Sequence, residues 1–114
     1  LHLSIRRQRQ MCIRDSLRVH PTLEDFRTYH QQRHGRWLGF STSGLCSYTK
    51  VQFKEDDWLL LGCETTGLSP EVLAACDLVV RIPMSQTGVR SLNLSVSAAV
   101  GLFEARRQLG YLED

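Results

Sequence analysis

Three short apolar runs, each followed by turn residues, are the feature that most constrains the fold of this chain. They occupy residues 37–41 (WLGFS), 58–62 (WLLLG) and 78–82 (LVVRI). A short helix is predicted between the last two runs, with Ser69 as its cap and Pro70 at its first position. Strand-like runs that alternate with helices indicate a parallel sheet covered by helices. The sequence therefore predicts an α/β fold.

Two further helices are indicated by their start signals. Thr22 followed by Asp25 resembles a capping box and predicts a helix that continues to about Gln32. A long apolar segment predicts a final helix over about 93–109. Just before the first helix, residues 17–19 (LRV) are interpreted as the remnant of a strand.

The final helix carries apolar residues on more than one side. One row comprises Leu94, Ala98, Leu102, Ala105 and Leu109, and the other Val96, Val100 and Phe103. Small residues four apart, which predict the close approach of another helix, are Ser97, Gly101 and Ala105. We expect one face to cover the sheet and the other a second subunit, because such helices are usually buried between two surfaces. The alternative is an unusually buried helix in a monomer.

Three loop strings follow the predicted strands in order within 34 residues. They are residues 62–68 (GCETTGL), 82–84 (IPM) and 90–95 (RSLNLS). Loops that follow parallel strands meet at the carboxyl edge of the sheet, where open α/β folds bind ligands. A nucleotide-like pocket is the first expectation.

The charge of the chain gives no general argument for nucleic-acid binding. The 114 residues have a formal net charge of +2, and the first 16 contain four of the 14 basic residues, Arg6, Arg7, Arg9 and Arg14. From Leu17 onward, 10 basic residues face 11 acidic ones. The slight excess of positive charge thus belongs to the N-terminal tract and not to the predicted domain.

Residues 7–16, at the end of the N-terminal tract 1–16, lack both helical and strand periodicity. Residues 7–16 (RQRQMCIRDS) resemble a translated adaptor sequence, which would make the tract foreign to the protein; the alternative is a genuine basic arm. We expect disorder in either case. The predicted domain is therefore 17–114.

The sequence gives little support for a metal site, a disulfide framework or a membrane-spanning segment. The cysteines lie far apart, with no Cys-x-x-Cys pair and no histidine at ligand spacing: Cys12, Cys46, Cys63 and Cys76. We therefore expect reduced thiols in a cytoplasmic protein and no zinc site. No apolar run approaches the roughly 20 residues of a membrane span, and no signal peptide opens the chain.

The loop strings also carry a resemblance to a known family. Residues 62–68, 81–84 (RIPM) and 90–95, which run into 103–104 (FE) and 107–110 (RQLG), resemble the C-terminal part of SPOUT-class, SpoU-type RNA 2′-O-methyltransferases. The most similar branch is that of the small enzymes acting on the tRNA wobble position. The resemblance extends over 17–111.

This resemblance implies a parallel sheet with a C-terminal trefoil knot that binds S-adenosylmethionine, in a homodimer formed through the C-terminal helix, with tRNA as substrate. Carried over by position, the cofactor-binding residues are Phe40, Gly62, Ile82 and Ser91, and supporting residues are Glu64, Leu92 and Asn93. Tight loops can read adenosine with main-chain groups, while Phe40 and Ile82 need only be apolar walls.

Several of these residues have a simpler interpretation. Glu64 could lock its own loop by accepting backbone N–H groups, and Asn93 could be a helix N-cap. Arg90 could contact RNA phosphate or pair with an acid. Cys63 stands where the family usually has proline. We expect a solvated surface for the histidines His20, His30 and His34.

The catalytic residue expected from the family is not found in this sequence. The family assigns that role to an arginine in an Asn- and Gly-rich loop after the first strand, and no such loop precedes Leu17. The resemblance thus implies a domain that lacks its N-terminal strand and helix, with the catalytic residue unknown. Thr66 also replaces a common family arginine. Two functions stay open: a tRNA 2′-O-methyltransferase, or an incomplete fragment that only binds cofactor or dimerises.

Overall fold

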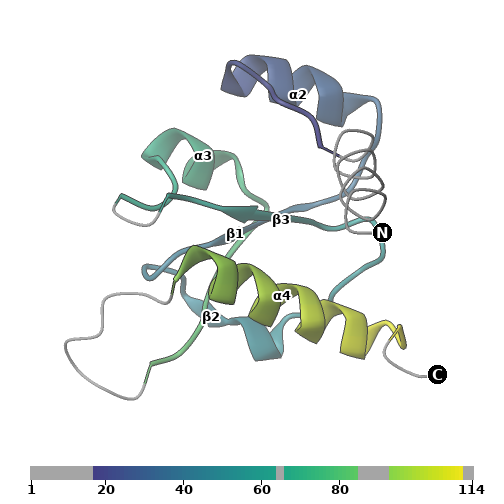
Figure 1. Cartoon of the computed structure of the whole chain (residues 1–114), viewed down its shortest axis with the longest axis vertical. Helices are drawn as coiled ribbons and strands as arrows, with labels where there is room; N and C mark the ends of the chain where they lie inside the picture. The colour runs from purple at the N-terminus through teal and green to yellow at the C-terminus, as the bar shows by residue number, and fades with distance from the viewer. Residues whose placement is uncertain (1–16, 64–65, 85–92, 112–114) are drawn as a thin grey trace, which may run out of the picture. The chain divides into compact units, whose positions relative to one another are not determined.

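A computed structural model of the protein describes residues 17–63, 66–84 and 93–111 and divides the chain into two compact units, 1–33 and 34–114. The first unit contains helix α2 (Leu23–Gln31). The elements of the second unit are β1 (Trp37–Phe40), β2 (Cys46–Ser47), the short 3₁₀ helix η1 (Tyr48–Lys50), β3 (Trp58–Leu61), α3 (Pro70–Ala75), β4 (Leu78–Arg81) and α4 (Leu94–Gln108) (Figure 1).

The four strands form one parallel sheet in the order β2-β4-β1-β3. Phe40, the last residue of β1, lies opposite Leu61 of β3 and Val80 of β4. The predicted parallel α/β architecture is confirmed, and each of the three predicted strands ends within one residue of its expected position. The trefoil knot stays a prediction, because the chain path that would form it includes residues 85–92, outside the described part.

The predicted helix starts are confirmed by their caps. The Thr22 hydroxyl accepts a hydrogen bond from the N–H of Asp25 at 3.1 Å. Ser69 accepts one from Val72 at 3.3 Å, with Pro70 in the first turn. Each hydroxyl satisfies an N–H group that has no partner within its helix, which is why these local signals were readable in the sequence.

The strand predicted at 17–19 is wrong. These residues form no regular secondary structure, and Leu17 and Val19 are 63% and 84% exposed. A strand is stabilised by pairing and by packing one face, and in the described structure this run has no such pairing.

Strand β2 was not predicted, because two residues carry no periodicity. It forms because its two residues pair with the edge of β4: Cys46 pairs with Val80, and Ser47 with Arg81. Gly44 brings the chain to that edge. A Cβ atom there would lie 2.7 Å from the carbonyl oxygen of Val80, so a larger residue would push β2 away.

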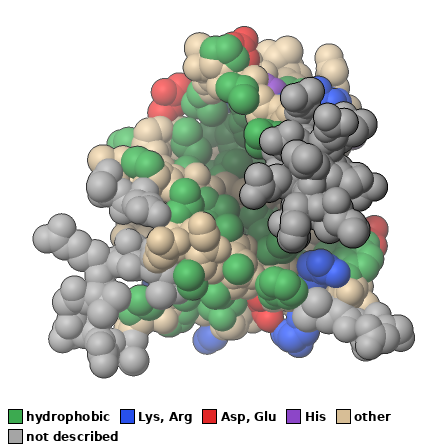
Figure 2. All heavy atoms as spheres, in the orientation of Figure 1, with side chains coloured by type: hydrophobic (Ala, Val, Ile, Leu, Met, Phe, Trp, Pro, Cys, Tyr) green, Lys and Arg blue, Asp and Glu red, His purple; other side chains and the backbone are tan. Residues whose placement is uncertain are grey.

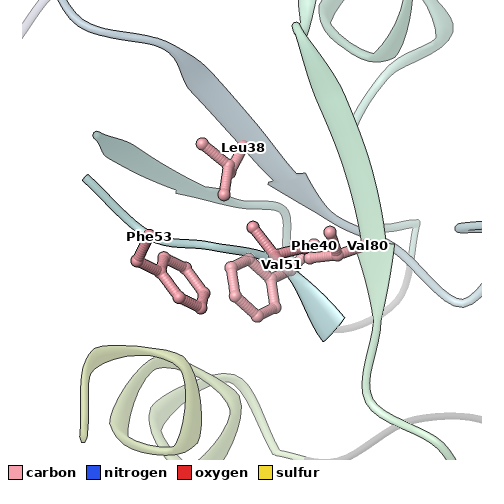
Figure 3. Packing of buried hydrophobic residues seen from close by; sticks show 5 residues of the cluster. All are labelled: Leu38, Phe40, Val51, Phe53 and Val80. Carbon is pink, nitrogen blue, oxygen red and sulfur yellow. The ribbon is translucent and has the colours of Figure 1, made fainter. Parts of the chain in front are cut away.

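The core of the second unit is a cluster of five buried side chains, shown in Figure 3: Leu38, Phe40, Val51, Phe53 and Val80. The two helices α3 and α4 cover opposite faces of the sheet, as two neighbouring residues of β1 show. Gly39 faces Cys76, which follows α3, and Phe40 faces Gly101 of α4. Successive residues of a strand point to opposite faces, so one helix covers each face.

Gly101 and Ala105, two of the three small residues of α4, pack on the sheet rather than on another helix, which corrects the prediction for these two positions. A Cβ atom at Gly101 would lie 2.6 Å from the ring of Phe40, and Ala105 packs against the core cluster. These residues are small because the ring of Phe40 in β1 occupies the space beside them.

The other side of α4 is largely uncovered. Gly101 is the one buried residue of this helix, and away from it exposed fractions of 47–52% are found for Val96, Leu102 and Phe103. Figure 2 shows hydrophobic side chains along this side. Both predicted apolar rows have exposed members, so the unusual burial of this helix within a single chain is not observed.

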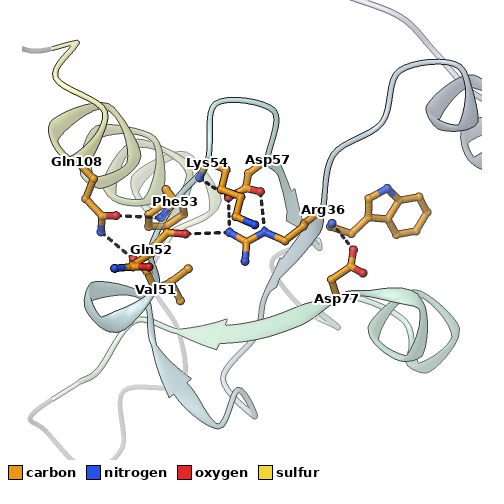
Figure 4. Close-up of polar contacts among 9 residues, drawn as sticks. Arg36, Val51, Gln52, Phe53, Lys54, Asp57, Asp77 and Gln108 are labelled. Carbon is orange, nitrogen blue, oxygen red and sulfur yellow. Dashed lines mark hydrogen bonds and ion pairs between the residues drawn. The ribbon is translucent and has the colours of Figure 1, made fainter.

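Gln108 fastens the end of α4 to the segment before β3. Its side-chain oxygen accepts the N–H of Phe53 at 2.9 Å, and its amide nitrogen donates to the carbonyl of Val51 at 2.9 Å (Figure 4). The nitrogen also lies 2.8 Å from Glu104. The amide thus satisfies backbone groups that a neighbouring strand would otherwise pair.

Two carboxylates tie the amino ends of three strands together (Figure 4). Arg36, just before β1, binds Asp57, just before β3, through two hydrogen bonds of 2.9 and 2.8 Å. Asp77, just before β4, accepts the N–H of Trp37 at 2.7 Å and donates its own N–H to the Trp37 carbonyl at 2.9 Å. Paired groups therefore hold the amino edge of the sheet.

The described residues contain no helix that is both long and apolar enough to cross a membrane. They also contain no group of three or more His, Cys, Asp or Glu side chains placed to hold a metal ion.

Candidate functional site

The carboxyl ends of β1, β3 and β4 meet at one edge of the sheet. Because Phe40 pairs with both Leu61 and Val80, the three strands end at the same level. The residues at or just after these ends include three of the predicted site positions: Phe40, Gly62 and Ile82. The topology therefore brings these positions to the same edge, as the sequence predicted.

Gly62 is required by the loop that follows it. A Cβ atom at this position would overlap the backbone of Gly67 and Leu68. The loop folds back on itself, since the N–H of Gly67 donates to the carbonyl of Cys63 at 2.8 Å. The Cys63 sulfur lies 2.6 Å from the hydroxyl of Thr66. The close approach that the sequence assigned to a ligand is thus made by the protein's own main chain.

Phe40 belongs to the core rather than to an open wall. Its side chain is 9% exposed and its ring faces Gly101. A ligand at this edge would therefore meet the main chain where β1 ends, and not the aromatic ring.

Ile82 is half-buried and packs against the core cluster, while Met84, two residues further on, is 37% exposed. Together they give the edge an apolar side beside β4. This agrees with the apolar surface expected at Ile82.

The turn after β1 is fixed from two directions. The Ser41 hydroxyl accepts the N–H of Ser43 at 3.2 Å, and the Ser41 carbonyl accepts the N–H of Gly44 at 3.1 Å. Arg81 of β4 donates to the Gly44 carbonyl at 2.9 Å. The sequence analysis did not single out Arg81 for this role, since its partner lies 37 residues away.

Asn93 is the N-cap of α4. Its side-chain oxygen accepts the N–H of Ser95 at 2.8 Å, and its carbonyl accepts the N–H of Ser97 at 2.8 Å. This is the simpler of the two interpretations made from the sequence. The remaining predicted site residues, Glu64, Ser91 and Leu92, lie outside the described residues, as does Arg90.

Among the described cysteines, Cys46 and Cys76 are free thiols. Burial and the nearby Asp77 carboxylate raise the pKa of the Cys76 thiol. A thiol with a raised pKa is a poor nucleophile, so Cys76 serves in packing against Gly39.

The sequence matches the SpoU rRNA Methylase family over residues 10–103. The chain belongs to this family. Among relatives, a tRNA (cytidine(34)-2′-O)-methyltransferase from Polaromonas is 44% identical over 79 residues, which are 68% of this chain and 48% of the relative. A tRNA (guanosine(18)-2′-O)-methyltransferase from Thermus thermophilus is 40% identical over 93 residues, 81% of this chain and 47% of the relative.

Solved structures of SpoU proteins share this fold. One of them comes from work on the 2-OH methylation of C/U34 on tRNA. It has a TM-score of 0.74 and is 41% identical to this chain, and the match covers 82% of this chain and 56% of the chain in that structure. The methyltransferase AviRb from Streptomyces viridochromogenes, in complex with AdoMet, has a TM-score of 0.74 and 29% identity over 80% of this chain and 38% of its own. The chain spans about half to three fifths of the length of the curated relatives it matches.

Proposed function

We propose that this SpoU family protein takes part in the S-adenosylmethionine-dependent 2′-O-methylation of tRNA, at the anticodon wobble nucleotide. The observation that carries the proposal is the convergence of three loop starts, at Ser41, Gly62 and Ile82, on one edge of a parallel sheet. Relatives named for cytidine 34 methylation support the choice of nucleotide. The proposed place of action is the cytoplasm, where tRNA is found.

The residues at the edge fit an adenosine-containing cofactor. Main-chain groups at Phe40 and Gly62 end neighbouring strands, and Ile82 with Met84 supplies an apolar side. Small ligands are typically held in this way, by apolar surface and a few fixed polar groups. In the proposal Ser91 also contacts the cofactor, with Glu64, Leu92 and Asn93 in support.

The cofactor would supply an activated methyl group bonded to a sulfonium sulfur. The protein must align the ribose 2′-oxygen with that methyl carbon and help to remove the hydroxyl proton. The fixed Ser41–Gly44 turn and the Gly62 loop can contribute alignment, because both are held by internal hydrogen bonds. We assign the proton acceptor to no residue of this chain.

We further propose that the protein is a trefoil-knotted homodimer formed through α4. The support is the exposed apolar side of this helix, contributed by Val96, Leu102 and Phe103. Burial of apolar surface is the main favourable term in most protein association.

The second candidate function is cofactor binding or dimerisation without catalysis. It stays open because the residues described at the carboxyl edge supply alignment and apolar surface, and none of them is assigned the role of proton acceptor. The first candidate predicts both cofactor binding and methyl transfer, whereas the second predicts cofactor binding or dimerisation and no methyl transfer.

A two-step experiment tests these proposals. Cofactor binding is measured by calorimetry for the 114-residue chain and for Ile82→Asp, which places a charge on the apolar side of the edge. Leu45→Asp is the matched control, since Leu45 is 95% exposed. We expect weaker binding for Ile82→Asp alone. An absence of binding to the unchanged chain would contradict the first candidate and the cofactor-binding form of the second.

Labelled methyl transfer is then measured on tRNA with a normal or a 2′-deoxy nucleotide at position 34. Incorporation that disappears with 2′-deoxy-34 supports the first candidate. Incorporation that persists, and disappears with 2′-deoxy-18 instead, would contradict the wobble assignment. Cofactor binding without any incorporation supports the second candidate.

A further inference from the structure

Two arginines surround one tyrosine ring in the N-terminal unit. The guanidinium carbon of Arg33 lies 3.6 Å from the centroid of the Tyr29 ring, and that of Arg18 lies 5.2 Å from it. The ring of His20 lies 4.9 Å from the same centroid. We call these four residues the Tyr29 cluster.

The Arg33 guanidinium is held at two points. It lies over the aromatic ring, and its Nη1 donates to the Tyr29 carbonyl at 3.3 Å. Both Arg33 and Arg18 are exposed. Contact with an aromatic ring favours a guanidinium without neutralising its charge, so both cations remain able to bind an anion.

In the part of the chain that the structure describes, no salt bridge neutralises the charges of the Tyr29 cluster. Within residues 17–63, 66–84 and 93–111, the salt bridges involve neither Arg18 nor Arg33. The acidic residues of α2, Glu24 and Asp25, lie in its first turn, whereas Arg33 follows its last. Two guanidinium groups around one ring repel each other, and an anion between them would remove that repulsion.

We propose that the Tyr29 cluster binds an unpaired segment of RNA, with Arg18 and Arg33 contacting phosphates and the supported Arg33 plane stacking on a base. Single-stranded RNA is commonly recognised by bases stacked on aromatic rings or on arginine, together with contacts to its phosphates. This inference rests on the proposed tRNA substrate. It adds a binding site for that substrate, formed by residues outside the three loops of the candidate cofactor site.

The test compares two double variants of the full chain. Arg18→Gln/Arg33→Gln removes both cations of the cluster, and Lys50→Gln/Lys54→Gln removes two exposed cations elsewhere. Binding of a tRNA anticodon stem-loop is measured by fluorescence anisotropy at several salt concentrations. For two lost phosphate contacts to a single strand, the slope of log K against log salt should become shallower by about 1.4 for the arginine variant. The lysine variant should keep the slope of the unchanged chain.

Conservative variants separate stacking from charge. Arg33→Lys keeps the cation but loses the planar group, so we expect an unchanged salt slope and a smaller preference for the stem-loop over a fully paired RNA. Tyr29→Phe should bind as the unchanged chain does, whereas Tyr29→Leu should lose that preference. An equal preference in Tyr29→Phe and Tyr29→Leu would overturn the stacking role.

The failure of this inference can be told apart from the failure of the proposed function. Cofactor affinity should be the same in all variants. If the unchanged chain binds no tRNA, both proposals are overturned. If it binds tRNA and the two double variants lose affinity equally, or the arginine variant loses none, the Tyr29 cluster is not the RNA site and the proposed function stands.

Discussion

Gly62 shows how a glycine at a predicted ligand site can be explained by the fold alone. Its missing side chain makes room for the backbone of Gly67 and Leu68. The sequence pattern located the residue correctly at the end of a strand, but the neighbour that fills the space became visible only when the loop closed on itself.

We expect Gly62→Ala to destabilise the protein by about 1–3 kcal/mol, the usual range for an overpacked site. Gly67→Ala is the matched control in the same loop. Gly67 has a φ of +68°, but no atom lies within 4 Å of the place that a Cβ would take, so its cost should be about 1 kcal/mol, from backbone conformation alone. Urea unfolding of both variants measures the difference, and equal losses would contradict the steric explanation.

Asp57 predicts a loss of stability in acid. Burial raises the pKa of its carboxyl, but hydrogen bonds from Arg36 and from the N–H of Lys54 lower it more, and the net pKa is below its ordinary value. A lowered folded-state pKa means that the stabilisation is present above the unfolded pKa of about 3.9 and is lost as pH falls through the folded pKa.

The measurement is the urea midpoint of the unchanged chain and of Asp57→Asn at pH 7 and pH 3. At pH 7 we expect Asp57→Asn to lower the free energy of unfolding by about 2 kcal/mol, because asparagine has no charge and keeps only part of the hydrogen bonding to Arg36. At pH 3 we expect a smaller difference between the two proteins. Glu104 also has a lowered pKa, of about 2, because Arg107 and Gln108 donate hydrogen bonds to it, so Glu104→Gln measures the separate contribution of this carboxyl to the loss of stability in acid. A difference for Asp57→Asn that does not change with pH would contradict the linkage.

At the scale of elements, local signals were the reliable ones. The apolar runs predicted β1, β3 and β4, and the caps Thr22 and Ser69 predicted two helix starts, because each depends on residues a few positions apart. Strand β2 was missed, since it forms only where β4 supplies an edge.

The orientation of α4 could not be predicted for the same reason. A stripe of small residues signals a close neighbour, but not whether that neighbour is a helix or the ring of Phe40, 61 positions away in the sequence. The pairing of Arg36 with Asp57 likewise joins residues 21 apart and carries no local pattern. At the site, strand ends were predictable, whereas the role of each side chain depended on such distant contacts.

Gln108 predicts how α4 is attached. Gln108→Leu would leave the N–H of Phe53 and the carbonyl of Val51 without their amide partner, at a cost of about 1–3 kcal/mol. We expect faster hydrogen exchange at the Phe53 amide in particular. Arg107→Leu, one residue earlier and exposed, should leave that amide protected. Equal exchange rates in both variants would contradict the attachment.

At the scale of the whole molecule, the exposed side of α4 determines the expected assembly. Leu102→Glu/Phe103→Glu places two charges on side chains that are 48% and 52% exposed, so the fold should be retained and the dimer lost. Sedimentation velocity measures the mass, and circular dichroism checks the fold. Leu45→Glu, on a loop, should remain dimeric. A monomer for the unchanged chain at all concentrations would contradict the proposed dimer.

The two ends of the sheet in the second unit are held in different ways. Arg36, Asp57 and Asp77 hold the amino ends of three strands, while the carboxyl ends pass into loops. Substitutions in the loops after the strands therefore fall away from the contacts at the amino ends that keep the strands in register. In a selection for altered ligand preference, we expect accepted substitutions to gather after the strands, whereas the three charged positions before them should resist exchange.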